Sequence, residues 1–515
     1  MNLQASNVFI DQLFRREIVP AHKHRQQNAP IKRLLLCLRS EAPTARLFTC
    51  WFKPGFFFVD LLGFIHHIKV VAIAIILLPT HCMQSNERTT ASLMQLPWQV
   101  LALACVFVFF PFYWRDFYPM PGTVRDFFQD WSSARSYLDG GSIYPSLPVM
   151  AEKYLNIRFD PRTMHLGQYS THPPPSVLLF IPWAYLSYAH AFLLWNLMGL
   201  FLLMVSLAWI LQELQVEWSQ ALAWLGVAVV VAASPLQSQI YHAQMNLLLL
   251  FLITASWRAD RHGHAGWAGA WLGLAAAIKL MPAFLFLIFL VRGSWKALFV
   301  GGIVWAACLL AAVGCFGWEA FSFYSQHLMP HLQQYRSAWL NQSLHGYFSR
   351  LLDVGQQTPN VIPWMTVPWL AKGLTWLSAG GVTFWSGWLT WSNRKQRRHD
   401  SSWGATLTAM LLASPFTWDH YLLLLVLPLI LLARSYTAGP ARWSWLYGVV
   451  LGLLWLHPAA AWSLTIPGGF DRGVATPWRS MTVISYKCYA MLILLALQWR
   501  LEHQRLVSAL HEREK

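Results

Sequence analysis

Long apolar runs, interrupted at intervals by single polar or charged residues, dominate the chain after residue 96. In a lipid bilayer a helix satisfies its own backbone hydrogen bonds, so these runs predict an all-α polytopic bundle of transmembrane helices. Several runs are shorter than the ~20 residues of a full crossing, so we expect about 10 to 13 membrane helices, some short or re-entrant. The runs lie near residues 97–114, 174–188, 189–212, 220–234, 245–257, 266–278, 281–292, 296–314, 363–390, 402–415, 421–434, 443–464 and 483–499.

The beginning of the chain does not follow this pattern. It is polar and basic, and its apolar stretch 56–79 is interrupted by two histidines and a lysine. Met83 or Met94 precedes the cleaner membrane run. We therefore expect two parts. Residues 1–90 form a poorly defined basic extension, either an over-called start or an extra membrane anchor, and residues 91–515 form an integral-membrane domain.

The composition of the 515 residues agrees with a membrane protein. Apolar residues make up 56% of the chain and charged residues 12%, about half the charged share of a soluble domain. These values exclude a disordered chain, a coiled coil and an ordinary cytosolic enzyme. The seven cysteines are scattered and form no CxxC pair, which argues against a disulfide framework or a structural zinc site.

The formal charge of +16 is concentrated in short connections between apolar runs. No basic face accompanies it, so a nucleic-acid partner is not expected. Basic connections mark the cytoplasmic side of a membrane protein. We place 258–261, 292–296, 394–398, 434–442 and the tail from residue 500 there.

The polar residues that interrupt the apolar runs then converge on the outer side. The run 174–188 must be re-entrant or interfacial for the loop 116–172 to lie outside as well. Buried ionisable groups in a membrane are costly and usually face a cavity, so we expect a polar site facing the periplasm or exterior of the inner membrane. Its candidate residues are Asp126, Asp130, Arg135, His172, Gln244, Asn246, Lys279, Asn341, Gln342, His345, Arg350, Asp419 and His420.

Two carboxylates, Asp126 and Asp130, are four residues apart and would share one face of a helix. A carboxylate at the lipid–water boundary can take a proton from an acceptor hydroxyl. The alternative is that both acids are solvated or pair with Arg125 and Arg135. Two acids are too few to predict a metal site.

Two cationic candidates stand next to apolar segments. Lys279 separates two apolar half-helices, so it needs a partner, water or the phosphate of a lipid; snorkelling to the interface is the alternative. His172 precedes three prolines and can bind an anion or relay a proton, unless it is only an interfacial histidine at a helix start. The Gln244 and Asn246 amides interrupt another run.

A polar turn at residues 340–350 is the last candidate region, together with Asp419 and His420. The amides of Asn341 and Gln342 and the ring of His345 can hydrogen-bond sugar hydroxyls, and Arg350 can bind phosphate in a fork geometry. For both regions an ordinary polar loop remains the alternative.

These motifs occur in an order that resembles glycosyltransferase family 87 of the GT-C superfamily. The order is Asp-Phe, Ala-Arg, Gly-Gly and Tyr after residue 125, then His-Pro-Pro, Gln-x-Asn, Ala-Ala-Ile-Lys-x-x-Pro, Asn-Gln-Ser-Leu and Ser-Pro-x-x-Trp-x-His. The resemblance runs from about residue 97 to 499. Three positions depart from the family pattern: Asp130 stands where an aromatic is usual, His172 replaces a tyrosine, and Ala243 replaces a glycine.

The resemblance implies a hexosyltransferase that moves a sugar, with mannose expected, from a polyprenyl-phosphate donor to a cell-envelope glycolipid or glycan. It implies an acidic base in the first outer loop, and the Asp-Phe motif places this role on Asp126. An inverting displacement without a cofactor is expected. A transporter or flippase of lipid-linked sugars is the alternative, and would require polar residues through the depth of the bundle. A structural subunit without catalysis would not explain the cost of the ionisable groups.

Overall fold

The computed structural model describes residues 103–104, 113–119, 124–158, 169–216, 232–355, 358, 360–396, 398–437, 444–466 and 473–513. These residues form helices and connections, and the described part of the chain contains no strand beyond an isolated bridge between Val361 and Ala475. The predicted all-α membrane fold is therefore confirmed. The predicted extension 1–90 and most of the predicted runs 97–114 and 220–234 lie outside the described residues.

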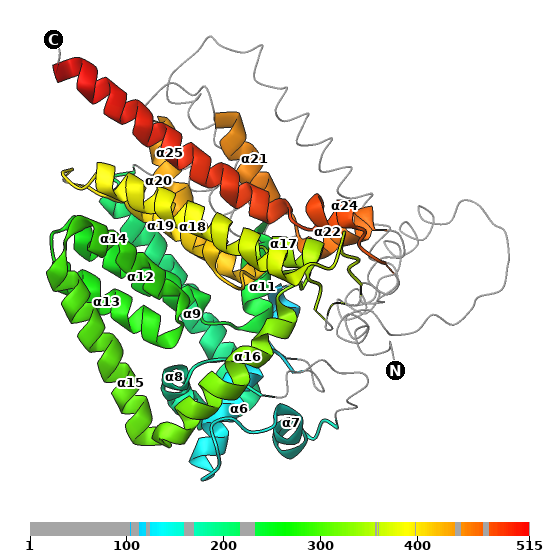
Figure 1. Ribbon diagram of the computed structural model, residues 1–515. Coiled ribbons are helices and arrows are strands. Elements are labelled where there is room, and N and C mark those ends of the chain that lie inside the picture. Colours follow the sequence, from blue (N-terminus) through cyan, green and yellow to red (C-terminus); the bar gives the residue numbers. More distant parts are fainter. Residues whose placement is uncertain are drawn as a thin grey trace, which may run out of the picture. The chain divides into compact units, whose positions relative to one another are not determined.

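The first group of helices precedes the polar turn at residues 340–350 (Figure 1). Its members are α6 (Phe127–Leu138), α7 (Leu147–Leu155), α8 (Pro174–Ala184), α9 (Tyr188–Glu213), α11 (Ser234–His242), α12 (Asn246–Arg261), α13 (Ala265–Ile278), η2 (Met281–Leu285), α14 (Phe286–Arg292), α15 (Trp295–Phe323), η3 (Tyr324–Leu328), α16 (Met329–Leu332) and η4 (Gln333–Tyr335).

The second group follows the turn and ends with the long C-terminal helix. Its members are α17 (Leu344–Leu352), α18 (Pro368–Ser392), α19 (Asp400–Ala413), η5 (Asp419–Leu425), α20 (Val426–Thr437), α21 (Ser444–Trp455), α22 (Pro458–Thr465), α24 (Pro477–Met481) and α25 (Tyr486–Arg513). The apolar run predicted at 443–464 is thus divided into α21 and α22.

Three segments of the described chain are long and apolar enough to cross a membrane: Tyr188–Glu213, Trp295–Tyr335 and Pro477–His503. The pair α11 and α12 passes the same test together but bends by 117° at its break, as a broken span or a re-entrant segment does. Four further apolar helices are too short to count by length, among them α8 and α13. The short helices agree with the prediction, and α8, with 11 residues, is shorter than the ~20 residues of a full crossing.

A crossing of small residues joins α13 to α15, which lie side by side in Figure 1. A Cβ added at Gly269 or Gly273 would collide with the backbone of Ala297 or Gly301 on α15. Glycines spaced by four residues allow helix backbones to approach closely, and this is how membrane helices gain packing contacts without a hydrophobic driving force. The crossing fixes α13, and with it the residue that follows α13, Lys279.

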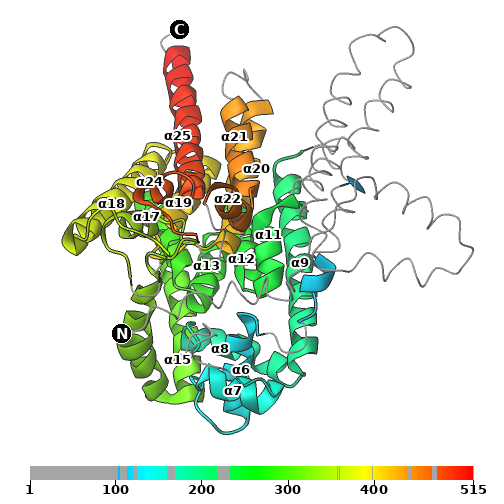
Figure 2. The same ribbon diagram turned by 90° about the vertical axis from the view of Figure 1, so that its right-hand side faces the viewer.

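Aromatic packing fixes the start of α6 against α8 and α9, and the short helices α6 to α8 form one group in Figure 2. Phe127 is fully buried and contacts the rings of Phe180, Phe192 and Trp195. Truncating such a buried ring costs about 3–5 kcal/mol. Because Phe127 follows Asp126 directly, this packing also determines where the Asp126 carboxylate lies.

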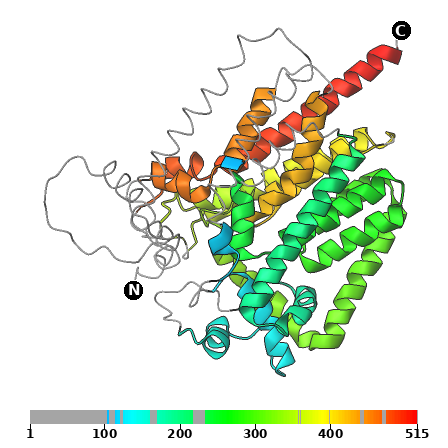
Figure 3. The same ribbon diagram turned by 180° about the vertical axis from the view of Figure 1, so that it is seen from behind.

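An ionic cluster occupies the far end of α12, where the sequence predicts a cytoplasmic connection. Asp260 Oδ2 lies 2.7 Å from Arg292 Nη1 and accepts a hydrogen bond of 2.9 Å from Trp403 Nε1. Arg261 pairs with Asp400. The helix α12, which packs against α9 (Figure 3), spans about 24 Å from Asn246 to this cluster. The basic connections and the Gln244–Asn246 segment are therefore at opposite ends of this helix.

Candidate active site

The carboxylate of Asp126 lies at the start of α6, and its two oxygens have different surroundings. Oδ2 lies 3.1 Å from His242 Nδ1 and accepts a hydrogen bond of 3.2 Å from Gln244 Nε2. Among the residues that the structure describes, nothing donates a hydrogen bond to Oδ1, and the side chain is 38% exposed. The open oxygen is therefore free to accept a proton from a bound hydroxyl.

The environment keeps this carboxylate ionised. Burial acts to raise the pKa of Asp126, but the charge and hydrogen bond of His242, the charge of His420 and the hydrogen bond from Gln244 outweigh it. Together they hold the pKa of Asp126 below its usual range. Asp126 is thus a carboxylate at neutral pH, the form that can act as a base.

The sharp bend between α11 and α12 brings His242 and Gln244 to Asp126. Ala243 at the bend has φ 47°, in the left-handed region, which costs a residue with a Cβ roughly 1–2 kcal/mol. Gln239 compensates by donating a hydrogen bond to the carbonyl of Gln244 and accepting one of 3.0 Å from Asn246 Nδ2. Asn246 therefore braces the corner, while Gln244 contacts the carboxylate.

The second carboxylate, Asp130, lies one turn further along α6 and is buried. Its Oδ1 is 2.7 Å from His172 Nδ1, and both side chains are almost inaccessible to solvent. The His172 carbonyl accepts a hydrogen bond of 2.9 Å from Tyr144 Oη. The structure thus brings together three candidates from the sequence, with Asp126 facing the open side and Asp130 engaged by His172.

Lys279 follows the last residue of α13 and lies outside the apolar helices. Its Nζ is buried, and the described residues give it no hydrogen-bond partner; it lies 3.8 Å from the centre of the Tyr421 ring. Burial lowers the pKa of Lys279 to about 7, although the charges of Asp130 and Asp126 oppose this change. A buried cation without a hydrogen-bond acceptor, near two carboxylates, is suited to an anionic ligand group.

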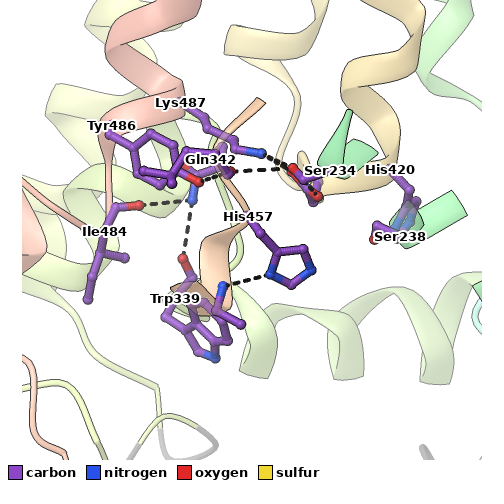
Figure 4. Close-up of polar contacts among 12 residues, drawn as sticks. Ser234, Ser238, Trp339, Gln342, His420, His457, Ile484, Tyr486 and Lys487 are labelled. Carbon is purple, nitrogen blue, oxygen red and sulfur yellow. Dashed lines mark hydrogen bonds and ion pairs between the residues drawn. The ribbon is translucent and has the colours of Figure 1, made fainter. Parts of the chain in front are cut away.

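The short helix η5 completes this cluster. The His420 ring lies 5.4 Å from the His242 ring, and His420 Nδ1 lies 3.4 Å from Ser238 Oγ (Figure 4). The next residue, Tyr421, is the ring beside Lys279. The sequence predicted His420 but not Tyr421.

A buried ion pair holds η5 in place against α11 and α25. Lys487 Nζ, at the start of α25, contacts Asp419 Oδ1 and donates a hydrogen bond of 2.7 Å to Ser234 Oγ (Figure 4). Ser234 Oγ also lies 3.1 Å from Asp419 Oδ2. Ser234 is the first residue of α11, the helix that ends with His242, so this group links three elements of the site.

The polar turn at residues 340–350 is engaged mainly with backbone groups. Asn341 Nδ2 donates to the carbonyls of Arg336 and Pro415, and Gln342 Nε2 donates to those of Trp339 and Ile484 (Figure 4).

Arg350 is fully buried beneath this turn. Its Nη1 donates to the carbonyls of Asn341 and Ala338, and its Nη2 donates to Ser485 Oγ. These contacts hold the turn against the start of α25. They do not connect it to Asp126, and the ligand-binding roles of Asn341, Gln342 and Arg350 stay predictions.

Two further predicted residues, Arg135 and His345, have neighbours other than Asp126 and Asp130 in the described part of the chain. Arg135 Nη1 donates to the carbonyl of Ala184, and its Nε lies 3.6 Å from Asp139. His345 is partly buried on α17, and burial, with the nearby charge of Arg336, lowers the pKa of its ring. Their roles also stay predictions.

The sequence did not point to His242, Tyr421 or Lys487. His242 directly precedes the Ala-Gln-x-Asn motif, and its position at a helix end was the available signal. Lys487 follows a short polar stretch and resembles a loop charge in the sequence, but it lies at the start of α25 and is fully buried. Among the described residues, no group of three His, Cys, Asp or Glu side chains is placed to hold a metal ion.

Comparison with known proteins identifies a family and two relatives. The model of glycosyltransferase family 87 matches residues 171–415. A polyprenol-phosphate-mannose-dependent alpha-(1-2)-phosphatidylinositol mannoside mannosyltransferase of Mycobacterium tuberculosis is 27% identical over 329 residues, which are 60% of this chain and 69% of the relative. The protein of the same name from Mycolicibacterium smegmatis is 24% identical over 392 residues, 70% of this chain and 81% of the relative. No solved structure gives a significant match. The family match over residues 171–415 and these two relatives support the identification of the chain as a glycosyltransferase of family 87.

Proposed function

We propose that this membrane glycosyltransferase transfers mannose from a polyprenyl-phosphate donor to a glycolipid or glycan of the cell envelope. The donor and the sugar are those for which both relatives are named. The observation that carries the proposal is that two complementary groups occur in one site. Asp126 has an oxygen, Oδ1, to which no described residue donates a hydrogen bond, and the buried Nζ of Lys279 has no described hydrogen-bond partner. One group can accept a proton and the other can stabilise a phosphate.

The distribution of charge supports an extracytoplasmic site. The basic connections pair with acids at one end of α12 and α13, whereas Gln244 and Lys279 lie at the other ends of these helices. Basic connections favour the cytoplasm. We infer that Asp126 and Lys279 face the periplasm or exterior of the inner membrane.

The proposed reaction is a single inverting displacement. Asp126 Oδ1 takes the proton of the acceptor hydroxyl, whose oxygen forms a bond to the anomeric carbon as the bond from that carbon to the phosphate oxygen breaks. His242 and Gln244 hold Oδ2 and so direct Oδ1 toward the acceptor. A well-positioned base contributes roughly 10²–10⁴-fold to the rate of such a step.

Lys279 stabilises the leaving group in this scheme. The polyprenyl phosphate gains negative charge as it departs, and a cation already desolvated at that position stabilises the charge without reorganising. The Tyr421 ring keeps the ammonium in place. The polyprenyl tail remains in lipid, so its binding energy holds the sugar close to the base.

A transfer assay in detergent tests the proposal. The purified full chain, given polyprenyl-phosphate-[14C]mannose and a phosphatidylinositol mannoside, should produce a labelled glycolipid with one more mannose. No membrane gradient exists in micelles, so a flippase would leave the donor chemically unchanged. Donor that stays intact with this acceptor and with mixed envelope lipids would contradict the proposed transferase.

The pH dependence of donor binding should report Lys279. Because its pKa is about 7, Lys279 loses its charge as the pH rises, while the donor phosphodiester stays anionic. The apparent KM for the donor should rise about tenfold between pH 6 and pH 8. Lys279→Arg keeps its charge over this range, so its donor KM should be nearly constant. If the donor KM of Lys279→Arg rose with pH as it does in wild type, the titrating group would not be Lys279.

A further inference from the structure

A second buried cation lies next to Asp126. The Arg125 side chain is only 5% exposed, and its Nε and Nη1 have no hydrogen-bond partner among the described residues. Native structures rarely leave buried donors unpaired without a functional reason. Arg125 directly precedes the residue proposed as the base, and its guanidinium interacts electrostatically with the Asp126 carboxylate, so its unpaired donors are close to where an acceptor must bind.

Stacking and one shared carboxylate hold the guanidinium. It lies 3.4 Å from the centre of the Tyr241 ring, and its Nη2 is 3.9 Å from Asp116 Oδ1. The same Asp116 oxygen is also 3.3 Å from Arg115 Nε. One acid thus faces two arginines, and the Arg125 guanidinium keeps Nε and Nη1 without a partner among the described residues.

Arg125 and Lys279 have different neighbours around the same base. Lys279 is close to Asp130 and Tyr421, whereas Arg125 is close to Asp116 and Tyr241. We infer that the two cations flank Asp126 on different sides. In an inverting displacement the acceptor attacks opposite the leaving phosphate, so a leaving group at Lys279 directs the acceptor to the other flank.

We propose that Arg125 binds the phosphodiester of an anionic acceptor lipid, in a subsite separate from the donor phosphate at Lys279. The inference rests on the proposed function and adds the residue that would hold the phosphodiester of the acceptor. The α6 N-terminus, which begins two residues after Arg125, supplies further positive potential for an anion. A guanidinium stacked on an aromatic ring is well suited to phosphate.

Kinetics of the purified full chain with two acceptors test this subsite. The first acceptor is a phosphatidylinositol mannoside, which carries a phosphodiester, and the second is octyl α-mannoside, which is uncharged. In Arg125→Gln we expect the KM for the phosphodiester acceptor to rise roughly tenfold or more. The KM for the donor and the kcat/KM for octyl mannoside should stay within about twofold of wild type. Arg158→Gln, at an exposed arginine, is the matched control.

Two other outcomes of these kinetics would overturn the acceptor subsite at Arg125. A rise in the donor KM would put the donor phosphate at Arg125 and overturn the proposal. An equal loss with both acceptors, not rescued by Arg125→Lys, would show a structural role and also overturn it. If Arg125→Gln fails to fold, wild type decides: phosphatidylinositol should compete with the phosphodiester acceptor and not with the donor. Absence of transfer in wild type would instead refute the proposed function itself.

Discussion

Asp126→Asn should abolish sugar transfer while leaving the folded protein intact. The amide can keep the contacts with His242 and Gln244 through its oxygen, but its nitrogen replaces the open Oδ1 and cannot accept a proton. We expect kcat to fall by about 10³-fold. The donor KM should change little, because the phosphate is assigned to Lys279. Initial rates at saturating donor, together with a thermal denaturation curve, measure both effects.

Asp139→Asn provides the control for this variant. Asp139 follows α6 at its other end and pairs with Lys153 on the surface, so its loss should leave transfer nearly unchanged. Near wild-type activity of Asp126→Asn would move the role of base to Asp130 or to another group. Asp130 is already engaged by His172, so we expect Asp130→Asn to reduce activity through the position of His172.

Lys487→Met should destabilise the protein strongly. The Lys487 side chain is fully buried, and its removal leaves Asp419 as a buried carboxylate without a counter-charge. Breaking one partner of such a pair costs about 3–5 kcal/mol. The unfolding temperature in detergent should therefore fall clearly. Activity should fall too, because the pair holds η5, which carries His420 and Tyr421.

A double variant separates the lost pair from the lost side chain. Asp419→Asn combined with Lys487→Met removes both charges, so it should regain part of the stability that Lys487→Met loses. Lys372→Met, at an exposed lysine on α18, is the matched control and should change stability by less than about 0.5 kcal/mol. If the double variant were no more stable than Lys487→Met, the pair could not be the cause.

The part of the site that the sequence predicted is the part carried by local spacing. Asp126 and Asp130 fall on one turn of α6, and Lys279 interrupts an apolar hairpin, so each stood out without knowledge of tertiary structure. His242 and Lys487 became recognisable only through contacts across the fold. The His242 partner is 116 residues away in sequence, and the Lys487 partner is 68 residues away.

The polar turn shows the converse problem. Asn341, Gln342 and Arg350 have side chains that suit sugars and phosphate, and the sequence offered no means of seeing that backbone carbonyls engage them. Irregular backbone in a membrane domain must have its hydrogen bonds satisfied internally. Here these three side chains meet that need for carbonyls in the segment 336–341 and for the carbonyl of Ile484. Likewise the apolar run at 443–464 was predicted as one segment, although His457 and Pro458 stand at the break that separates α21 from α22.

The unequal oxygens of Asp126 bear on regiochemistry. If Asp126 is the base, a hydroxyl can be deprotonated only where it reaches Oδ1, since Oδ2 is occupied by His242 and Gln244. A pyranose with several free hydroxyls would then react at whichever carbon its seated ring presents to that single oxygen. Linkage position would accordingly be set by the orientation of the acceptor ring, and substitutions that reshape its seat should yield altered linkages before they eliminate turnover.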